Sequence, residues 1–158
     1  MRFSEVFGQE LIKENLMRAI SIKKMSHAYI LNGEKGMGKR DLAEAFAAAL
    51  LCEEHGKDSC GQCRTCRRID GHNHPDVITI EPEKGKDTIA TRDIKSKLVG
   101  DISIRPYESE YKVYIIPNAH LLNRESQNAI LKTIEEPPEY AIVLLLMLIL
   151  AVRVSYMV

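Results

Sequence analysis

A glycine-rich loop between a short apolar run and an alanine-rich stretch constrains the fold of this chain more than any other segment. The apolar run is His27–Leu31, the loop is Gly33–Lys39, and residues 41–51 are rich in Ala and Leu. A short apolar run predicts a buried strand, and Ala and Leu favour a helix. Strand, glycine loop and helix in this order present backbone N–H groups at a helix N-terminus to phosphate oxygens. The segment predicts a phosphate-binding loop, with a plain glycine turn as the alternative.

The loop follows the phosphate-binding pattern GxxxxGK[ST] except at its last position. Gly33, Gly38 and Lys39 stand at the required places, with Gly36 between them. The hydroxyl of the final Ser or Thr normally binds magnesium. Arg40 stands there instead, and a guanidinium has no acceptor for a metal ion. These five residues predict a vestigial nucleotide site. Binding of ATP or ADP without hydrolysis remains open, and Mg²⁺ is not expected.

A second departure lies after the apolar run 112–116, which we expect to be another strand. In a hydrolysing phosphate-loop site, an acidic pair follows such a strand: one carboxylate holds magnesium and the other orients the attacking water. Here the run is followed by Pro117 and Asn118, neither of which carries a carboxylate. We therefore interpret Pro117 and Asn118 as a degenerate acidic site. No catalytic residue is predicted, and hydrolysis is expected to be lost.

The remaining pattern alternates strands and helices, which predicts an α/β fold with a parallel sheet covered on both faces. Further strands are expected at residues 76–80 and 141–146. Amphipathic spacing predicts a helix over residues 9–24. Thr91 and Asn123 are expected to cap two more helices, the second of which ends at Pro137. The sequence thus predicts a three-layer phosphate-loop fold.

All four cysteines lie within 15 residues, with the spacing C-x7-C-x2-C-x2-C. In a reducing compartment such a cluster indicates a metal site rather than disulfides. Four thiolates complete a tetrahedral structural zinc site and leave no open position for catalysis. The predicted zinc ligands are Cys52, Cys60, Cys63 and Cys66. The nearby His55, His72 and His74 are possible substitute ligands, but we interpret each as a solvated loop residue. Reduced cysteines without metal are the alternative to the zinc site.

Charge and the chain ends limit the classes of function. Lys plus Arg and Asp plus Glu both number 22, which argues against a strongly basic nucleic-acid coat. The N-terminus shows no apolar signal segment, so a cytoplasmic location is expected. Residues 141–158 carry a single charge, Arg153. We expect a core strand to residue 146 followed by an apolar tail over 147–158. A membrane anchor and a second core strand are the alternatives.

Several segments together resemble the N-terminal domain of bacterial clamp-loader subunits of DNA polymerase III. The resemblance covers about residues 3–146, and residues 128–138 are its most specific part. Besides the glycine loop and the cysteines, it is carried by Phe3–Gln9, Ser26–Tyr29, Arg105–Glu108, Tyr111–Ile116 and Asn128–Pro138. The resemblance implies an AAA+ domain over residues 1–146, with an inserted zinc module at about 52–70. It also implies a truncation on the C-terminal side, because the tail 147–158 no longer resembles the family.

The resemblance implies a role in DNA replication, within a complex that loads the sliding clamp onto primed DNA for a DNA-directed DNA polymerase, a nucleotidyltransferase. Two kinds of subunit share this layout: the ATP-hydrolysing gamma/tau subunit and the delta-prime subunit, a stator with a degraded site. The changes at Arg40, Pro117 and Asn118 favour the delta-prime kind. Its partners would be the gamma/tau and delta subunits. The sliding clamp and primed DNA would be contacted through the complex, and no membrane contact is expected. A gamma/tau-like ATPase and a non-functional truncated fragment are the alternatives.

Overall fold

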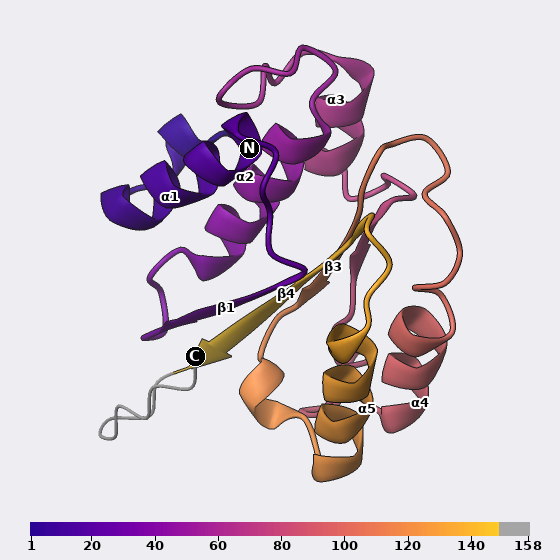
Figure 1. The fold of residues 1–158 in the computed structure, drawn as a ribbon. Helices are drawn as coiled ribbons and strands as arrows, with labels where there is room; N and C mark the ends of the chain where they lie inside the picture. The colour runs from indigo at the N-terminus through magenta and orange to yellow at the C-terminus, as the bar shows by residue number, and fades with distance from the viewer. Residues whose placement is uncertain (149–158) are drawn as a thin grey trace.

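Four parallel strands form a single sheet at the centre of the molecule (Figure 1). The structure is a computed structural model that describes residues 1–148. Neighbouring strands follow the order β1-β4-β3-β2. Their bounds are β1 Ala28–Gly33, β2 Val77–Thr79, β3 Lys112–Ile116 and β4 Ala141–Leu148. The predicted α/β class and the parallel sheet are confirmed.

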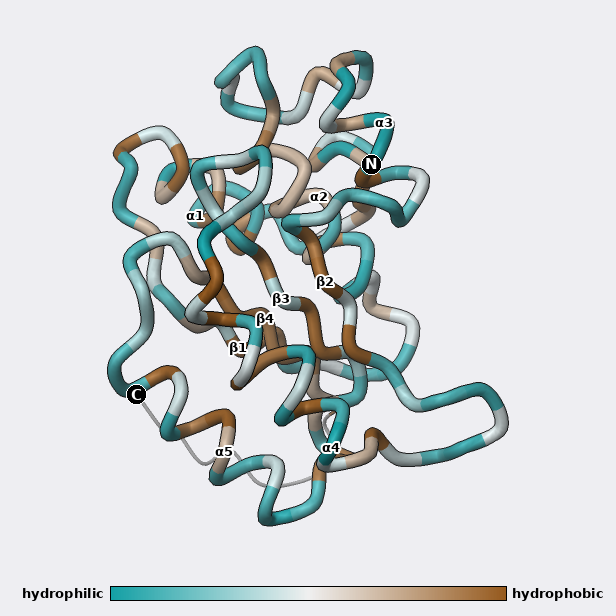
Figure 2. Tube along the Cα trace, turned by 90° about the vertical axis from the view of Figure 1, so that its right-hand side faces the viewer, coloured by the Kyte–Doolittle hydropathy of each residue, from teal (hydrophilic) through white to brown (hydrophobic). Residues whose placement is uncertain are grey.

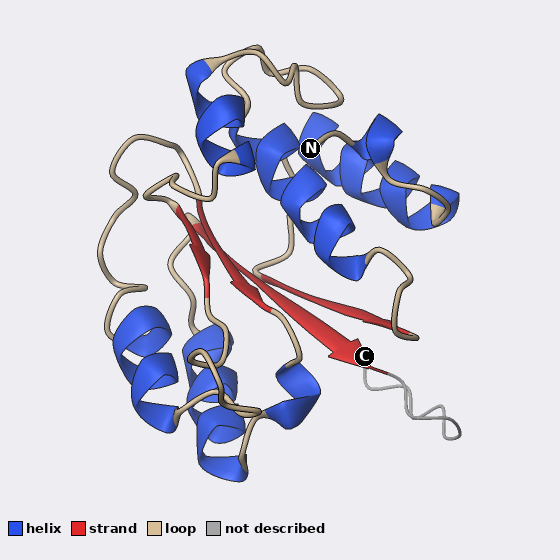
Figure 3. Cartoon of the chain, turned by 180° about the vertical axis from the view of Figure 1, so that it is seen from behind, coloured by secondary structure: helices blue, strands red, loops and turns tan. Residues whose placement is uncertain are grey.

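Helices cover both faces of this sheet (Figure 3). Side chains alternate along a strand, so Val113 and Ile115 of β3 face one core, while Tyr114 and Ile116 face the other. Figure 2 shows the strands as the apolar centre of the chain. The first core contains helices α1 (Glu10–Ser21), α2 (Lys39–Leu51) and α3 (Arg64–Asp70). The second contains α4 (Thr91–Ile94), the π-helical segment Lys95–Val99 and α5 (Arg124–Glu135).

Local capping chemistry explains one predicted boundary and corrects another. Asn123 caps α5 as predicted, because its side-chain oxygen accepts the Ser126 N–H at 2.8 Å. Thr91 does not cap α4, since Ala90 is the residue before the helix and Thr91 is already helical. The Thr91 hydroxyl instead contacts Asn123 Nδ2 at 2.7 Å. Tertiary contact between α4 and α5 therefore uses the hydroxyl that the sequence alone suggested for capping.

The last strand is longer than the apolar pattern predicts. β4 continues to Leu148, which pairs with Gly33 at the end of β1. Met147 and Leu148, expected to begin an apolar tail, therefore extend the sheet instead. The remaining tail, 149–158, lies outside the described residues. Within residues 1–148, no helix is long and apolar enough to cross a membrane.

Candidate functional site

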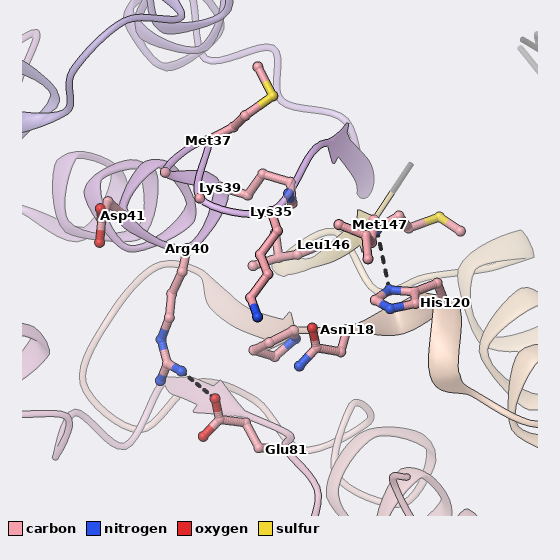
Figure 4. A pocket seen from close by; sticks show the side chains of 14 residues that line it. Lys35, Met37, Lys39, Arg40, Asp41, Glu81, Asn118, His120, Leu146 and Met147 are labelled. Carbon is pink, nitrogen blue, oxygen red and sulfur yellow. Dashed lines mark hydrogen bonds and ion pairs between the residues drawn. The ribbon is translucent and has the colours of Figure 1, made fainter. Parts of the chain in front are cut away.

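A cavity of about 540 Å³ opens where the carboxyl ends of the strands meet (Figure 4). Parallel strands place their carboxyl ends at one edge of the sheet, which is where α/β proteins bind ligands. The loop after β1, Glu81 after β2, and Pro117 and Asn118 after β3 all reach this edge. The cavity is lined by Lys35–Asp41, Glu81, Pro117, Asn118, His120 and Leu146–Leu148. The structure thus brings the predicted loop and the predicted degenerate acidic site to one place.

The glycine loop holds a backbone shape that its glycines permit. Gly36 and Gly38 have φ values of 84° and 69°, in the left-handed region that favours glycine. Lys39 begins α2 and folds back over the loop. Its Nζ donates to the carbonyl oxygens of Gly33 at 2.8 Å and Glu34 at 2.5 Å. The ammonium group therefore lies on the loop at the entrance to α2, where an anion would find both the helix N-terminus and a cation.

Arg40 extends from α2 across the cavity toward β2 (Figure 4). Its Nε donates to Glu44 Oε1 at 3.0 Å, and its Nη1 donates to the Glu81 carboxylate. Partial burial works against the charged guanidinium, but the two carboxylates together outweigh it and raise the Arg40 pKa. Position 40 therefore carries a fixed positive charge where the phosphate-loop pattern would supply a neutral hydroxyl.

The end of β3 offers no acidic group to this cavity. Pro117 and Asn118 follow the strand directly, and Asn118 adopts a left-handed backbone with φ of 57°. The imidazole of His120 also lines the cavity, and its Nδ1 accepts the Leu148 N–H at 3.2 Å. His120 therefore ties the end of β4 to the cavity wall.

Glu81 lines the cavity, although its sequence position alone did not identify it as a site residue. It follows the predicted strand 76–80, which ends at the same sheet edge as the glycine loop. An acidic residue directly after a buried parallel strand is the signal that could have identified it. Its partner Arg40 lies 41 residues earlier, so their contact depends on the strand order rather than on local sequence.

The four cysteines form a second candidate site, away from the cavity. Their sulfur atoms all lie within 4.8 Å of one another. A tetrahedral zinc ion with Zn–S bonds of about 2.3 Å needs sulfurs about 3.8 Å apart, so a small contraction would close the shell. Cys52 directly follows α2, Cys63 caps α3 and Cys66 lies within α3. The residues present therefore fit a structural metal ion such as zinc.

Backbone amides of the module point at these sulfurs. Cys52 Sγ accepts the Cys60 N–H at 3.3 Å, and Cys60 Sγ accepts the N–H groups of Gln62 and Cys63 at 3.4 and 3.2 Å. Those two amides lower the pKa of the Cys60 thiol to about 6, whereas burial raises the pKa of Cys52 and Cys66. Hydrogen bonds to sulfur stabilise the thiolate form that a metal requires.

Histidines take no part in this cluster within the described residues, and one of them was interpreted wrongly from the sequence. His55 and His72 are exposed, as expected for loop residues. His74 is buried, with Nδ1 accepting the Asp76 N–H at 3.1 Å, so it is a packing residue rather than a solvated one. Burial also lowers the His74 pKa.

Comparisons with known proteins identify the family. A family profile described as "DNA polymerase III, delta subunit" matches residues 8–148. DNA polymerase III subunit tau of Bacillus subtilis is 41% identical over 145 residues, which are 91% of this chain and 25% of that protein. Subunit tau of Escherichia coli is 37% identical over 139 residues, covering 87% of this chain and 21% of that protein. Subunit gamma of Buchnera aphidicola is 35% identical over 139 residues, covering 87% and 37%.

A solved structure shares the fold. It is a DNA polymerase III gamma subunit-related protein from Thermotoga maritima, with a TM-score of 0.58 and 23% identity. The match covers 85% of this chain and 38% of that one. This chain spans only a fifth to a quarter of the length of its tau relatives from B. subtilis and E. coli. The match of one profile to nearly all the described residues shows that the chain belongs to the DNA polymerase III delta subunit family, with relatives among the gamma/tau clamp-loader subunits.

Proposed function

We propose that this chain is the N-terminal AAA+ part of a clamp-loader subunit that has lost its own ATP hydrolysis. It helps load the sliding clamp onto primed DNA in the delta-prime manner, as a structural neighbour of ATP-hydrolysing gamma/tau subunits and of delta. Its glycine loop, Gly33–Lys39, is a phosphate-binding loop, and its cysteine module holds a structural zinc ion. Relatives named as DNA polymerase III tau and gamma subunits support the clamp-loader setting.

One observation carries the loss of hydrolysis: among residues 1–148, the positions that would hold magnesium and orient water in a hydrolysing phosphate-loop site carry other groups. Arg40 replaces the metal-binding hydroxyl, and its guanidinium is bound by Glu44 and Glu81. Pro117 and Asn118 replace carboxylates at the end of β3. Phosphoryl transfer depends on a placed metal and a positioned nucleophile, so losing both functions leaves a loop that can bind phosphate without cleaving it.

An ATP-hydrolysing gamma/tau-like subunit is the second candidate, and it fits the comparisons better. The curated relatives named above are tau or gamma subunits, and Gly33, Gly38 and Lys39 retain the phosphate-binding pattern. Similarity at this level reports descent, whereas hydrolysis depends on a few groups in one cavity. The two candidates therefore differ in one measurable activity.

A single-turnover ATPase assay with and without Mg²⁺ separates these candidates. We expect the 158-residue chain to release no phosphate above the background of a Lys39→Ala variant. The matched gain-of-function variant combines Arg40→Thr, Pro117→Asp and Asn118→Glu, which returns the missing hydroxyl and carboxylates. Magnesium-dependent hydrolysis by the unmodified chain that disappears in Lys39→Ala would establish the gamma/tau-like candidate instead.

A further inference from the structure

We propose that the cavity binds the phosphate chain of a nucleotide without a divalent cation, using the Arg40 guanidinium as its second cation beside Lys39. This inference rests on the proposed phosphate-binding role of the Gly33–Lys39 loop and adds to it the charge requirement of the ligand. Its distinctive consequence is that chelating magnesium should not release the nucleotide.

The cations of the cavity wall suit a phosphate chain. Lys35 and Arg40 lie on the cavity wall, and Lys39 lies on the loop beside them (Figure 4). Arginine binds phosphate oxygens through two parallel N–H bonds and keeps its charge at all working pH values. The N-terminus of α2, a helix of 13 residues, adds free backbone N–H groups at the same place. Three side-chain cations and the N-terminus of a helix thus line the same cavity.

The same wall is poorly built for magnesium. Magnesium requires near-octahedral oxygen ligands and is usually held by one or two carboxylates besides phosphates and water. In the lining formed by the described residues, the carboxylates are Asp41 and Glu81. Glu81 is already bound to the Arg40 guanidinium, so a metal at that carboxylate would sit against a fixed positive charge. Arg40 therefore replaces the metal rather than cooperating with it.

Glu81 would then act as an internal competitor for Arg40. The Arg40 and Glu81 side chains are 48% and 41% exposed, and ion pairs with this exposure contribute little stability. A phosphate chain carries more charge than one carboxylate and can displace Glu81 from Nη1. The second contact, from Arg40 Nε to Glu44 at 3.0 Å, can persist and hold the guanidinium in place. Removing the charge of Glu81 should therefore strengthen phosphate binding.

The test is titration of a fluorescent ATP analogue into the 158-residue chain, in EDTA and in excess Mg²⁺, with unlabelled ATP and inorganic tripolyphosphate as competitors. We expect a Kd in EDTA equal to or lower than the Kd in Mg²⁺, and competition by tripolyphosphate. Binding that requires Mg²⁺ would overturn the inference. Binding that tripolyphosphate does not displace would also overturn it, because the phosphate chain would then not be the recognised group.

Variants assign the effect to Arg40. Arg40→Thr should weaken binding in EDTA at least about tenfold, because charge-assisted hydrogen bonds are lost. Glu81→Gln should tighten binding about twofold to fivefold by releasing the guanidinium. Arg92 and Glu83 form a similar exposed ion pair outside the cavity. Arg92→Thr and Glu83→Gln are therefore matched controls, and we expect them to leave the Kd of the ATP analogue unchanged. Weaker binding by Glu81→Gln, or equal effects of Arg40→Thr and Arg92→Thr, would contradict the assignment.

Failure of this inference can be told apart from failure of the proposed function. Absence of ATP binding in both buffers overturns metal-free binding and the phosphate-binding role of the loop, and it leaves the proposed loss of hydrolysis standing. Magnesium-dependent binding accompanied by release of phosphate overturns both. Circular dichroism of each variant must match the parent chain, so that a loss of binding reports on the cavity rather than on unfolding.

Discussion

Replacing the buried Asp76 by Asn should destabilise the chain strongly, because its carboxylate organises the loop that leads into β3. Asp76 is fully buried. Its Oδ1 accepts the Tyr107 N–H at 2.6 Å, and its Oδ2 accepts the N–H groups of Glu108 and Ser109 at 2.9 Å each. In Asp76→Asn, an amide nitrogen takes the place of Oδ2. This nitrogen can only donate, so the N–H groups of Glu108 and Ser109 would lose their acceptor.

The size of this effect follows from the number of hydrogen bonds lost. Hydrogen bonds to a charged acceptor contribute about 1.5–3 kcal/mol each, so losing two predicts a destabilisation of about 3–6 kcal/mol. That is a large part of the total stability of a domain, about 5–15 kcal/mol. Urea unfolding followed by circular dichroism measures the loss directly.

A matched control distinguishes the effect of burial on stability from the effect of the number of hydrogen bonds. Asp58 also accepts three backbone N–H groups, from Phe3 at 2.9 Å, Ser4 at 3.2 Å and Ser59 at 2.7 Å, but it is partly exposed. Water can replace those bonds, so Asp58→Asn should cost only about 1 kcal/mol. If Asp76→Asn costs no more than Asp58→Asn, the reasoning from buried charge-assisted bonds is wrong.

Three further outcomes are expected. Zinc analysis of the purified chain should find about one ion per chain, and Cys63→Ser or chelation should lower the free energy of unfolding by several kcal/mol. The control His55→Ser, at an exposed position, should retain both metal and stability. A chain that is equally stable without metal would contradict the prediction. Asn123→Ala should cost about 1 kcal/mol in urea unfolding, because the Ser126 N–H loses its acceptor; an unchanged midpoint would mean that the cap contributes nothing. Burial, with the hydrogen bond to Asp101, raises the pKa of Tyr114 far above its ordinary value, so the phenol stays protonated in the folded chain while the unfolded phenol ionises near pH ~10. Stability should therefore fall as the pH rises above that value, and ultraviolet titration should show a tyrosine that ionises only on unfolding; the same stability loss in Tyr114→Phe would refute this cause.

Features encoded in neighbouring residues could be predicted from the sequence. The run before Gly33 and the alanine-rich stretch after Lys39 form β1 and α2, because apolar content and propensity act locally. Asn123 caps α5 because its acceptor reaches an amide three residues away. The spacing of the four cysteines also predicted their convergence, since each x2 step is one tight turn.

Features that depend on distant contacts could not be predicted. Arg40 meets Glu81 only because β1 and β2 end at the same edge of the sheet. His74 is buried once the chain has folded, and no local pattern reports this. Thr91 was expected to cap a helix, but its hydroxyl contacts α5 instead, which is a tertiary contact overriding a local preference.

The central claim is that the cavity binds nucleotide phosphates without cleaving them. Its most direct test monitors radiolabelled ATP bound to the chain in one sample, first in EDTA and then after addition of Mg²⁺. We expect ATP to bind in EDTA and to remain intact after the metal is added, with the Lys39→Ala variant binding none. Conversion of the bound ATP to ADP on addition of Mg²⁺ would contradict this and identify the chain as an active ATPase.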